Sequence, residues 1–260
     1  MPEQQKNAKN RLMNLVIDMG NSYSKIAVCQ GKEILESAIS EKISNREIAY
    51  FIENYPELRG AIFSSVANHS RELIDYLDAS FDTFLELTGQ TPLPLKSLYK
   101  TPETLGFDRI AAVVGAHTIF PGHNVLVIDA GTAITFDMVT AEGEYTGGNI
   151  SPGLNMRFRA LHKFTSRLPQ LTFREEAVRL IGTTTDEAII SGVVNGLVHE
   201  VNGYISEISS KYKNLRVVLT GGDANSFDKK LKNSIFVVAH LNLIGLNRIL
   251  DYNAEKNMEK

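Results

Sequence analysis

The chain has 260 residues, and a hydrophobic content of 43% with 22% charged residues is ordinary for a globular protein. A formal charge of −3 gives no electrostatic reason to expect nucleic acid or an acidic membrane as a partner, so a small soluble substrate fits better. The single cysteine, Cys29, excludes an internal disulfide and a paired-thiol zinc site, which favours a reducing, cytoplasmic compartment.

The N-terminal stretch is polar, and it lacks the apolar core of a secretion signal. We expect residues 1–12 to be a disordered extension. No later apolar run approaches the roughly 20 residues that a membrane span needs. Period-two and helical patterns then predict an order βββαβαβ, with strands at 15–18, 25–30, 34–39, 60–66 and 83–88, and helices at 45–55 and 70–81, the second capped by Ser70.

Residues 89–106 carry three prolines and little apolar periodicity, which predicts a long functional loop or a seam between two halves. A Gly/Pro loop is expected again at 146–154, followed by a short helix and a polar connection at 163–176. The remaining patterns predict helices at 107–118, 185–212, 226–233 and 242–253, and strands within 124–145, 216–223 and 235–240. Strands alternating with helices indicate an α/β protein whose sheets are covered on both faces.

One pattern occurs twice. When Asp18 is aligned with Asp129, an offset of 111 residues, the apolar strand before the aspartate and the X-Gly after it match. An aspartate at the exit of a buried strand is held rigidly and can bind a cation or a metal-bound water. The following glycine permits a tight turn and lets backbone N–H groups approach a phosphate. Each copy alone could be a plain hairpin turn, but two copies in register argue against that interpretation.

A duplicated half with one such hairpin in each copy resembles the superfamily of acetate and sugar kinases, Hsp70 and actin. The resemblance implies two actin-like (ribonuclease H-like) lobes, 13–105 and 106–260, whose hairpins grip the phosphates of ATP from opposite sides of a cleft. A strand with a Gly-Gly turn supports the adenosine in that superfamily, and "VVLTGGDA" at 217–224 matches it.

Four stretches narrow the resemblance: "DMGNSYSK" from Asp18, "GFDR" from Gly106, "DAGTAITFD" from Asp129 and "GGNISPG" from Gly147. Together they look like type III pantothenate kinase, which phosphorylates the primary hydroxyl of pantothenate with ATP to 4'-phosphopantothenate, the first step towards coenzyme A. The transfer needs in-line positioning, charge neutralisation and a carboxylate for the hydroxyl proton. Asp108 is the expected general base, although an aspartate there could also merely offset a helix dipole.

The resemblance assigns further roles. It implies Mg²⁺ at Asp18, reached through water, and a monovalent cation, K⁺ or NH₄⁺, at Asp129. The residues expected to bind ATP are Asp18, Met19, Gly20, Asn21, Ser22, Tyr23, Ser24, Lys25, Thr132, Gly221 and Gly222. Those expected to bind pantothenate are Tyr99, Gly106, Phe107, Asp108, Arg109 and Thr185, with Arg109 offering its planar fork to the substrate.

Family enzymes are homodimers in which the segment matching "IGTTTDEAIISG" reaches into the neighbour's pantothenate pocket. The family usually has a lysine and an asparagine where this chain has Thr183 and Thr184, so which threonine contacts the substrate stays open. The same residues also make a strong helix N-cap without any substrate contact. The glycines of "GGNISPG" either let the backbone pass close to substrate or partner, or belong to a plain loop.

Two other functions are compatible with the pattern: a catalytically silent relative that acts as an accessory regulator, and a kinase of the same superfamily for another small substrate. Intact Asp18, Asp108 and Asp129 argue against the first, and the "GFDR" and "GGNISPG" stretches argue against the second. The six histidines show no metal-ligand spacing, Cys29 suits a core position, and Ser64 and Ser65 lack a nucleophile motif. Neither nucleic acid nor a membrane is expected as a partner.

Overall fold

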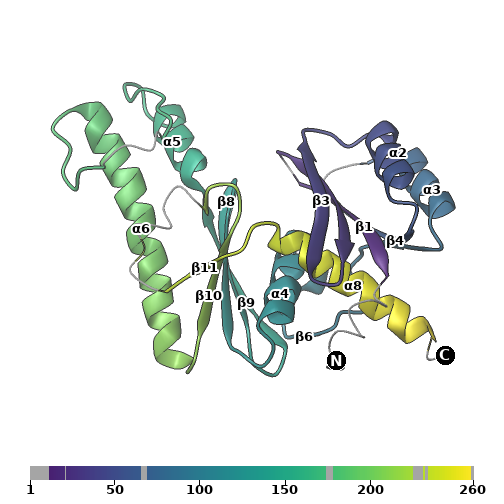
Figure 1. Ribbon diagram of the computed structural model, residues 1–260. Helices are drawn as coiled ribbons and strands as arrows, with labels where there is room; N and C mark the ends of the chain where they lie inside the picture. The colour runs from purple at the N-terminus through teal and green to yellow at the C-terminus, as the bar shows by residue number, and fades with distance from the viewer. Residues whose placement is uncertain are drawn as a thin grey trace. The chain divides into compact units, whose positions relative to one another are not determined.

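The computed structural model of the protein describes residues 12–20, 22–65, 69–173, 178–224, 231 and 234–258, and the chain divides into two compact units (Figure 1). The first unit contains the described residues up to Pro121, the short segment Gly143–Tyr145 and the segment that begins at His240. The second unit contains Gly122–Glu142 and the described residues between Thr146 and Ala239.

The first unit is built on a sheet of five strands in the order β3-β2-β1-β4-β5. Its first three strands form an antiparallel meander, and β4 and β5 run parallel to β1. The strands are β1 (Met13–Met19), β2 (Ser24–Gln30), β3 (Glu33–Ser40), β4 (Leu58–Ser65) and β5 (Thr83–Glu86), and the helices between them are α2 (Asn45–Asn54) and α3 (Arg71–Ser80).

Alternation along β1 sends its side chains to opposite faces of the sheet. Leu15 and Ile17 join the buried cluster formed with α2 and α3, which lie side by side in Figure 1. Asn14 faces the other way and donates to Asn247 and Asp251 of α8 (Leu241–Met258), each at 2.8 Å. Both faces of the sheet are therefore covered, as the sequence predicts.

Helix α8 packs against α4 (Phe107–Ile119) at two facing glycines. A Cβ on Gly115 would overlap the carbonyl oxygen of Leu241, and a Cβ on Gly245 would overlap that of Ala111. The two backbones approach so closely only because neither glycine carries a side chain. Between β5 and α4 the chain forms only the short strand β6 (Lys96–Ser97) and a 3₁₀ turn (Pro102–Thr104), so the predicted long loop is largely confirmed.

The second unit repeats the strand order of the first. Neighbouring strands run β11-β10-β7-β8-β9, and β6 pairs with the first residues of β9, Glu144 and Tyr145. The strands are β7 (Val125–Ala130), β8 (Ala133–Val139), β9 (Glu144–Pro152), β10 (Arg216–Thr220) and β11 (Phe236–Val237). In each sheet an antiparallel hairpin, β1–β2 or β7–β8, is flanked by a parallel strand, β4 or β10, which confirms the α/β class and the predicted duplication.

Two helices cover this sheet, α5 (Leu154–Lys163) and the long α6 (Thr185–Lys211), which pack together in Figure 1. Phe158 of α5 and Val193, Leu197 and Val201 of α6 share one buried cluster with Leu126, Ile128 and Phe136 of the sheet. The predicted helix at 185–212 is thus confirmed almost to the residue.

The prediction of a loop at 146–154 is wrong, because most of this segment is strand β9. Gly and Pro suggested a loop, yet Gly148 lies so close to the carbonyl oxygen of Phe136 that a Cβ there would overlap it. Its missing side chain lets two strands approach and makes no turn. The strand expected at 235–240 shortens to Phe236–Val237, and the last helix extends to Met258.

Two predictions lie partly or wholly outside the described residues. The helix expected at 226–233 falls almost entirely there, as do residues 1–11 of the expected N-terminal extension. The boundary expected between residues 105 and 106 stays a prediction. It assigns α4 and α8 to the second lobe, whereas the division into compact units places both helices in the first unit. Among the described residues, no helix combines the length and apolar character that a membrane crossing needs.

Candidate active site

The first Asp-X-Gly turn joins β1 to β2. In this antiparallel hairpin Asp18 pairs with Lys25 and Met19 with Ser24, so the carboxylate and the ammonium group belong to the same face of the sheet. The amide of Gly20 donates to the carbonyl oxygen of Tyr23 at 3.1 Å, and a Cβ on Gly20 would lie 2.9 Å from that oxygen. The turn therefore requires glycine, and it fixes an acidic group and a basic group side by side at the strand ends.

The other residues expected at this turn differ in their exposure. Tyr23 and Ser22 are exposed and Ser24 is buried, whereas Asn21 lies outside the described residues. The side chain of Met19 packs in the hydrophobic core, so only its backbone could reach a nucleotide.

Two residues that the sequence did not single out join this turn. Ser64 of β4 stands opposite Asp18 in the parallel register, and its buried hydroxyl has no hydrogen-bond partner among the described residues. His240, just before α8, adopts a left-handed conformation with φ 58°, and its buried Nδ1 also lacks a described partner. Burial, and then the charge of Lys25, lower the pKa of His240 below its ordinary value. Nothing in the local sequence could have revealed either residue, because only sheet register and the return of α8 bring them here.

The second Asp-X-Gly turn joins β7 to β8. Its Gly131 amide donates to the carbonyl oxygen of Ala133 at 3.0 Å, and Thr132 is exposed at the tip. In the parallel pairing of β7 with β10, Thr220 stands opposite Asp129, just as Ser64 stands opposite Asp18. Each aspartate is thus followed by a glycine turn and faced by a buried hydroxyl residue, which extends the duplication beyond the predicted motif.

The Gly-Gly turn after β10 closes on this second turn. Gly221 has φ 98°, and a Cβ on it would overlap the carbonyl oxygen of Ala130 and lie 2.5 Å from Oδ1 of Asp129. The amide of Asp223 donates to that same carbonyl at 2.9 Å, and burial raises the pKa of the Asp223 carboxyl. Gly222, in contrast, has open space where its side chain would be. The structure therefore brings Asp129, Thr132 and the predicted Gly-Gly turn together.

The N-terminus of α4 carries the candidate base. Asp108 is the second residue of the helix, and its Oδ1 accepts a hydrogen bond from the amide of Arg109 at 2.8 Å. A Cβ on Gly106 would overlap that same oxygen, so the glycine leaves room for the carboxylate to fold over the helix end. The guanidinium of Arg109 lies 5.5 Å from the ring centroid of Tyr99, and Tyr99 stacks on Tyr145 with centroids 6.0 Å apart. Three residues expected at the pantothenate pocket, Tyr99, Asp108 and Arg109, are therefore neighbours, with Gly106 and Phe107 beside them in the chain.

The three threonines at the start of α6 make different contacts. Thr184 is the N-cap, and its hydroxyl accepts from the amide of Glu187 at 3.2 Å. The amide and hydroxyl of Thr183 both donate to the Glu187 carboxylate, and these bonds hold its pKa below the usual range. Thr185 is exposed and lines a groove between α5 and α6. Contacts with Glu187 thus account for Thr183 and Thr184 at the start of the helix, and the substrate contact of Thr185 stays a prediction.

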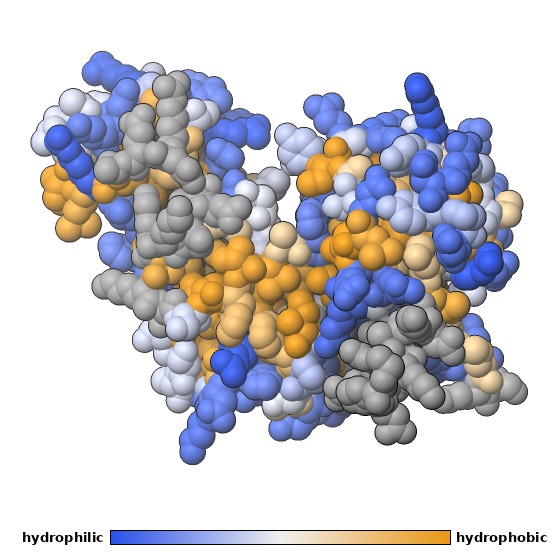
Figure 2. All heavy atoms as spheres, in the orientation of Figure 1, coloured by the Kyte–Doolittle hydropathy of each residue, from blue (hydrophilic) through white to orange (hydrophobic). Residues whose placement is uncertain are grey.

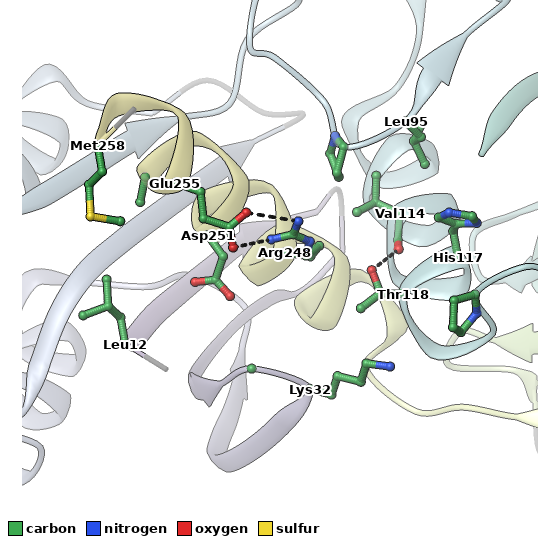
Figure 3. Close-up of a pocket in the computed structure, with 14 residues that line it drawn as sticks. Leu12, Lys32, Leu95, Val114, His117, Thr118, Arg248, Asp251, Glu255 and Met258 are labelled. Carbon is green, nitrogen blue, oxygen red and sulfur yellow. Dashed lines mark hydrogen bonds and ion pairs between the residues drawn. The ribbon is translucent and has the colours of Figure 1, made fainter. Parts of the chain in front are cut away.

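A cavity of about 590 Å³ in the first unit lies at the far end of β1 from the Asp18 turn (Figure 3). Leu12, the β2–β3 turn, the last turn of α4 and the second half of α8 surround it, and Figure 3 shows Arg248 paired with Glu255 on its wall, at 3.0 and 3.3 Å. None of the predicted site residues lines this cavity. Its size alone therefore does not make it the active site.

The donor sets fit the expected ions in different ways. Among the described residues no three His, Cys, Asp or Glu side chains cluster as a metal centre, so any Mg²⁺ would keep most of its water and phosphate ligands. The unpartnered hydroxyl of Ser64 opposite Asp18 suits such a hydrated ion. At Asp129, Oδ1 of the carboxylate and the carbonyl oxygen of Ala130 both face Gly221, where a Cβ would lie 2.5 Å from the first and overlap the second, so two oxygens converge there. Cys29 is buried with its pKa raised to about 12, mainly by burial, which agrees with a core role.

Comparison with known proteins gives a consistent result. The family model described as type III pantothenate kinase matches residues 14–207. The type III pantothenate kinase of Phocaeicola vulgatus is 47% identical over 241 residues, which is 93% of this chain and 99% of that protein. The enzyme of Porphyromonas gingivalis is 41% identical over 242 residues, covering 92% and 98% of the two chains.

Solved structures agree with the fold. A chain described as a Baf family transcriptional activator from Campylobacter jejuni aligns with a TM-score of 0.60 at 22% identity, covering 93% of this chain and 99% of its own. An activator of 2-hydroxyisocaproyl-CoA dehydratase from Clostridium difficile, with bound ADPNP, aligns with a TM-score of 0.54 at 13% identity, covering 95% and 97%. At these identities the likeness concerns the fold, whereas the family model and the relatives match most of the chain in sequence. The chain belongs to the type III pantothenate kinase family.

Proposed function

We propose that this chain transfers the γ-phosphoryl group of ATP to the primary hydroxyl of pantothenate, giving 4'-phosphopantothenate in the first step of coenzyme A biosynthesis, in the cytoplasm. The observation that carries the proposal is the pair of Asp-X-Gly turns. Each is closed by a glycine amide that donates to a carbonyl oxygen of the hairpin, and each has its aspartate faced by a buried hydroxyl residue. A hairpin used only as a turn needs neither the second copy nor those hydroxyls.

In this proposal the Asp18 turn and the Asp129 turn hold the triphosphate. Mg²⁺ supplies charge neutralisation on the phosphate oxygens when bound. Asp18 and the Ser64 hydroxyl would face this hydrated ion, Lys25 would add positive charge, and Thr132 would donate from the second turn. Gly221 and Gly222 support the adenosine, which the open space at Gly222 would admit.

Asp108 acts as the general base on the pantothenate hydroxyl. Its Oδ1 is held by the amide of Arg109, which fixes the carboxylate plane and leaves Oδ2 to take the proton as the oxygen attacks phosphorus. Arg109, stacked on Tyr99, presents its planar fork to the polar groups of pantothenate. The helix N-terminus positions this carboxylate. A strong base is not needed, because a loose transition state leaves the proton on the nucleophile until late in the transfer.

Asp129 holds the monovalent cation beside the triphosphate. We expect turnover to rise steeply when K⁺ or NH₄⁺ replaces Na⁺, because a site of few oxygen ligands selects by ion size and hydration. Steady-state rates measured in the three chloride salts at equal ionic strength test this. Equal rates in all three salts would contradict the cation role of Asp129.

We also propose that the active form is a homodimer in which Thr185 reaches the partner's pantothenate pocket. Thr185 lines a groove of about 890 Å³ between α5 and α6, with walls that include Phe164, Leu168 and Ile189. Phe164 is 80% exposed, and Leu180 and Ile181 are 71% and 76% exposed. Figure 2 shows apolar atoms at the outer edge of this unit, over the loop that leads into α6. So much apolar surface around a substrate threonine supports an interface between two copies.

One assay tests the activity. Purified protein is incubated with ATP, Mg²⁺, K⁺ and a panel of small alcohols that includes pantothenate, and ADP release is followed. We expect ADP release that depends on pantothenate. Release with a different alcohol would instead favour another kinase of the superfamily, and no release with any acceptor would favour a silent accessory protein.

A further inference from the structure

Arg157, in the first turn of α5, joins three parts of the second unit at one guanidinium group. Its Nε donates to the carbonyl oxygen of Pro152 at 2.8 Å, and its Nη2 donates to Oγ of Ser151 at 3.0 Å. Nη2 also donates to the carboxylate of Glu200 on α6. The two charged side chains are only 21% and 23% exposed, so each depends on the other for compensation of its charge.

Pro152, which accepts one of these bonds, directly precedes Gly153, and Gly153 contacts the second Asp-X-Gly turn. Gly153, which follows Pro152 and caps α5, donates its amide to the carbonyl oxygen of Thr132 at 3.2 Å. A Cβ on Gly153 would overlap the carbonyl oxygens of both Gly131 and Thr132. The backbone at the end of β9 is therefore in close contact with one side of the turn.

A second backbone segment, the Gly-Gly turn after β10, contacts the other side of the turn. Gly221 and Asp223 contact Asp129 and Ala130 there, and they continue directly from β10, which pairs with β7 along its whole length. Gly153, in contrast, lies in the connection between β9 and α5. Arg157 is the charged side chain whose bonds, to both Ser151 and Pro152, fix the chain at that point.

We infer that Arg157 is a positioning residue for the turn that binds the phosphates and the monovalent cation. Its bonds to Ser151 and Pro152 hold Gly153 against the carbonyl of Thr132, and this contact keeps Thr132 and the Asp129 carboxylate in their places. Glu200 neutralises and orients the guanidinium from α6. Arg157 also lines the groove that contains Thr185, and the role assigned to it here rests on the proposed function of Asp129 and Thr132.

The first test needs no ligand. In the Arg157→Ala variant we expect amide hydrogen exchange to accelerate about 10-fold or more in peptides covering the β7–β8 turn and residues 147–156, but not in β1–β2. The lost bonds lower the free energy of local opening at the end of β9, and exchange rates follow that free energy. Arg159→Ala is the matched control, since Arg159 is an exposed arginine of the same helix. Unchanged exchange in the β7–β8 turn would overturn the inference whatever the chain catalyses.

The second test measures binding. Calorimetric titration with a non-hydrolysable ATP analogue, without pantothenate, should give an affinity about 10-fold weaker in Arg157→Ala, and the K⁺ concentration for half-maximal turnover should rise similarly. Wild-type nucleotide affinity in the variant would overturn the inference. A wild-type protein that turns over no pantothenate would overturn the proposed function alone, since the exchange result stands without it.

A charge swap separates positioning from a merely structural ion pair. The double variant Arg157→Glu, Glu200→Arg restores opposite charges across α5 and α6, but a carboxylate at 157 cannot donate to the Pro152 carbonyl. We expect its melting temperature to recover relative to either single variant while nucleotide affinity stays low. If affinity recovers together with stability, the pair is structural only. Should Arg157→Ala fail to fold, Arg157→Lys replaces it, because lysine keeps the charge opposite Glu200 but loses the guanidinium fork that spans Ser151 and Pro152.

Discussion

Asp108 is the second residue of α4 and Asp186 is the second residue of α6, so the chain contains its own control for a catalytic role. Both carboxylates meet the positive end of a helix dipole, and removing the charge of either should lower stability by a similar small amount. Only Asp108 is proposed to take a proton. We therefore expect Asp108→Asn to lower turnover about 100- to 10,000-fold, the usual contribution of a general base.

Asparagine at 108 can still accept the hydrogen bond from the amide of Arg109, so the fold and the nucleotide affinity of that variant should persist. Steady-state kinetics and calorimetric ATP binding on Asp108→Asn and Asp186→Asn check both points. If the two variants turn over alike, Asp108 only stabilises its helix and the base lies elsewhere.

Among single residues, the sequence predicts those candidate site residues that belong to a local motif, and their roles stay predictions. Asp18 and Asp129 follow apolar strands and precede turn glycines. A Cβ on Gly20 would lie 2.9 Å from a carbonyl oxygen, whereas one on Gly131 would make only ordinary contact. Ser64 and His240 could not be found in this way. Their relation to the Asp18 turn depends on which strand pairs with β1 and where α8 begins, and neither is encoded near them in the chain.

Among the elements, the contact between α4 and α8 depends on missing side chains. We expect Gly245→Ala to lower the free energy of unfolding by about 1–3 kcal/mol, because the added methyl group overlaps a backbone carbonyl that cannot turn aside. Gly203→Ala in α6 is the matched control, since Gly203 has open space beside it and alanine there should add up to about 1 kcal/mol through helix propensity. Urea unfolding of both variants measures the difference, and effects of equal sign would refute the close packing.

The element that the sequence predicted wrongly has a related cause. Composition indicated a loop at 146–154 because Gly and Pro are frequent in turns. In the structure Gly148 serves the approach of β9 to β8, and Gly153 serves the contact with the next turn. Glycine has both uses, and the choice between them depends on a neighbouring strand that is ten or more residues away. Helix α6, with seven turns of periodic apolar residues, needed no such distant information.

For the whole molecule, the repeated strand order explains why duplication was visible in the sequence while the division into units was not. Helix α4 follows β5 and helix α8 follows β11, so the two occupy equivalent places in the two repeats. Yet both belong to the first compact unit, where they pack through Gly115 and Gly245. A boundary drawn from sequence similarity cannot reproduce a compact unit that contains the last helix of the other repeat.

The proposed homodimer would bury the exposed apolar residues before α6. Gly182 is tightly packed, because a Cβ on it would overlap the backbone of Glu187 and Ala188, so the segment is held at the start of the helix with Ile181 exposed. Nothing in the described fold needs that side chain. We expect Ile181→Glu to leave the monomer folded but to prevent dimer formation, because a charge buried at an interface without a partner is strongly unfavourable.

The same variant should lose turnover if Thr185 acts in the partner's pocket, because the pantothenate pocket of a monomer lacks the threonine that the second copy would supply. Light scattering after size exclusion gives the mass, and kinetics at several protein concentrations give the activity. Leu35→Glu is the control, as Leu35 is an exposed apolar residue on β3 of the first unit. A dimer that persists in Ile181→Glu would place the interface elsewhere, whereas a fully active monomer would mean that each chain completes its own pantothenate pocket and that Thr185 serves only to begin α6.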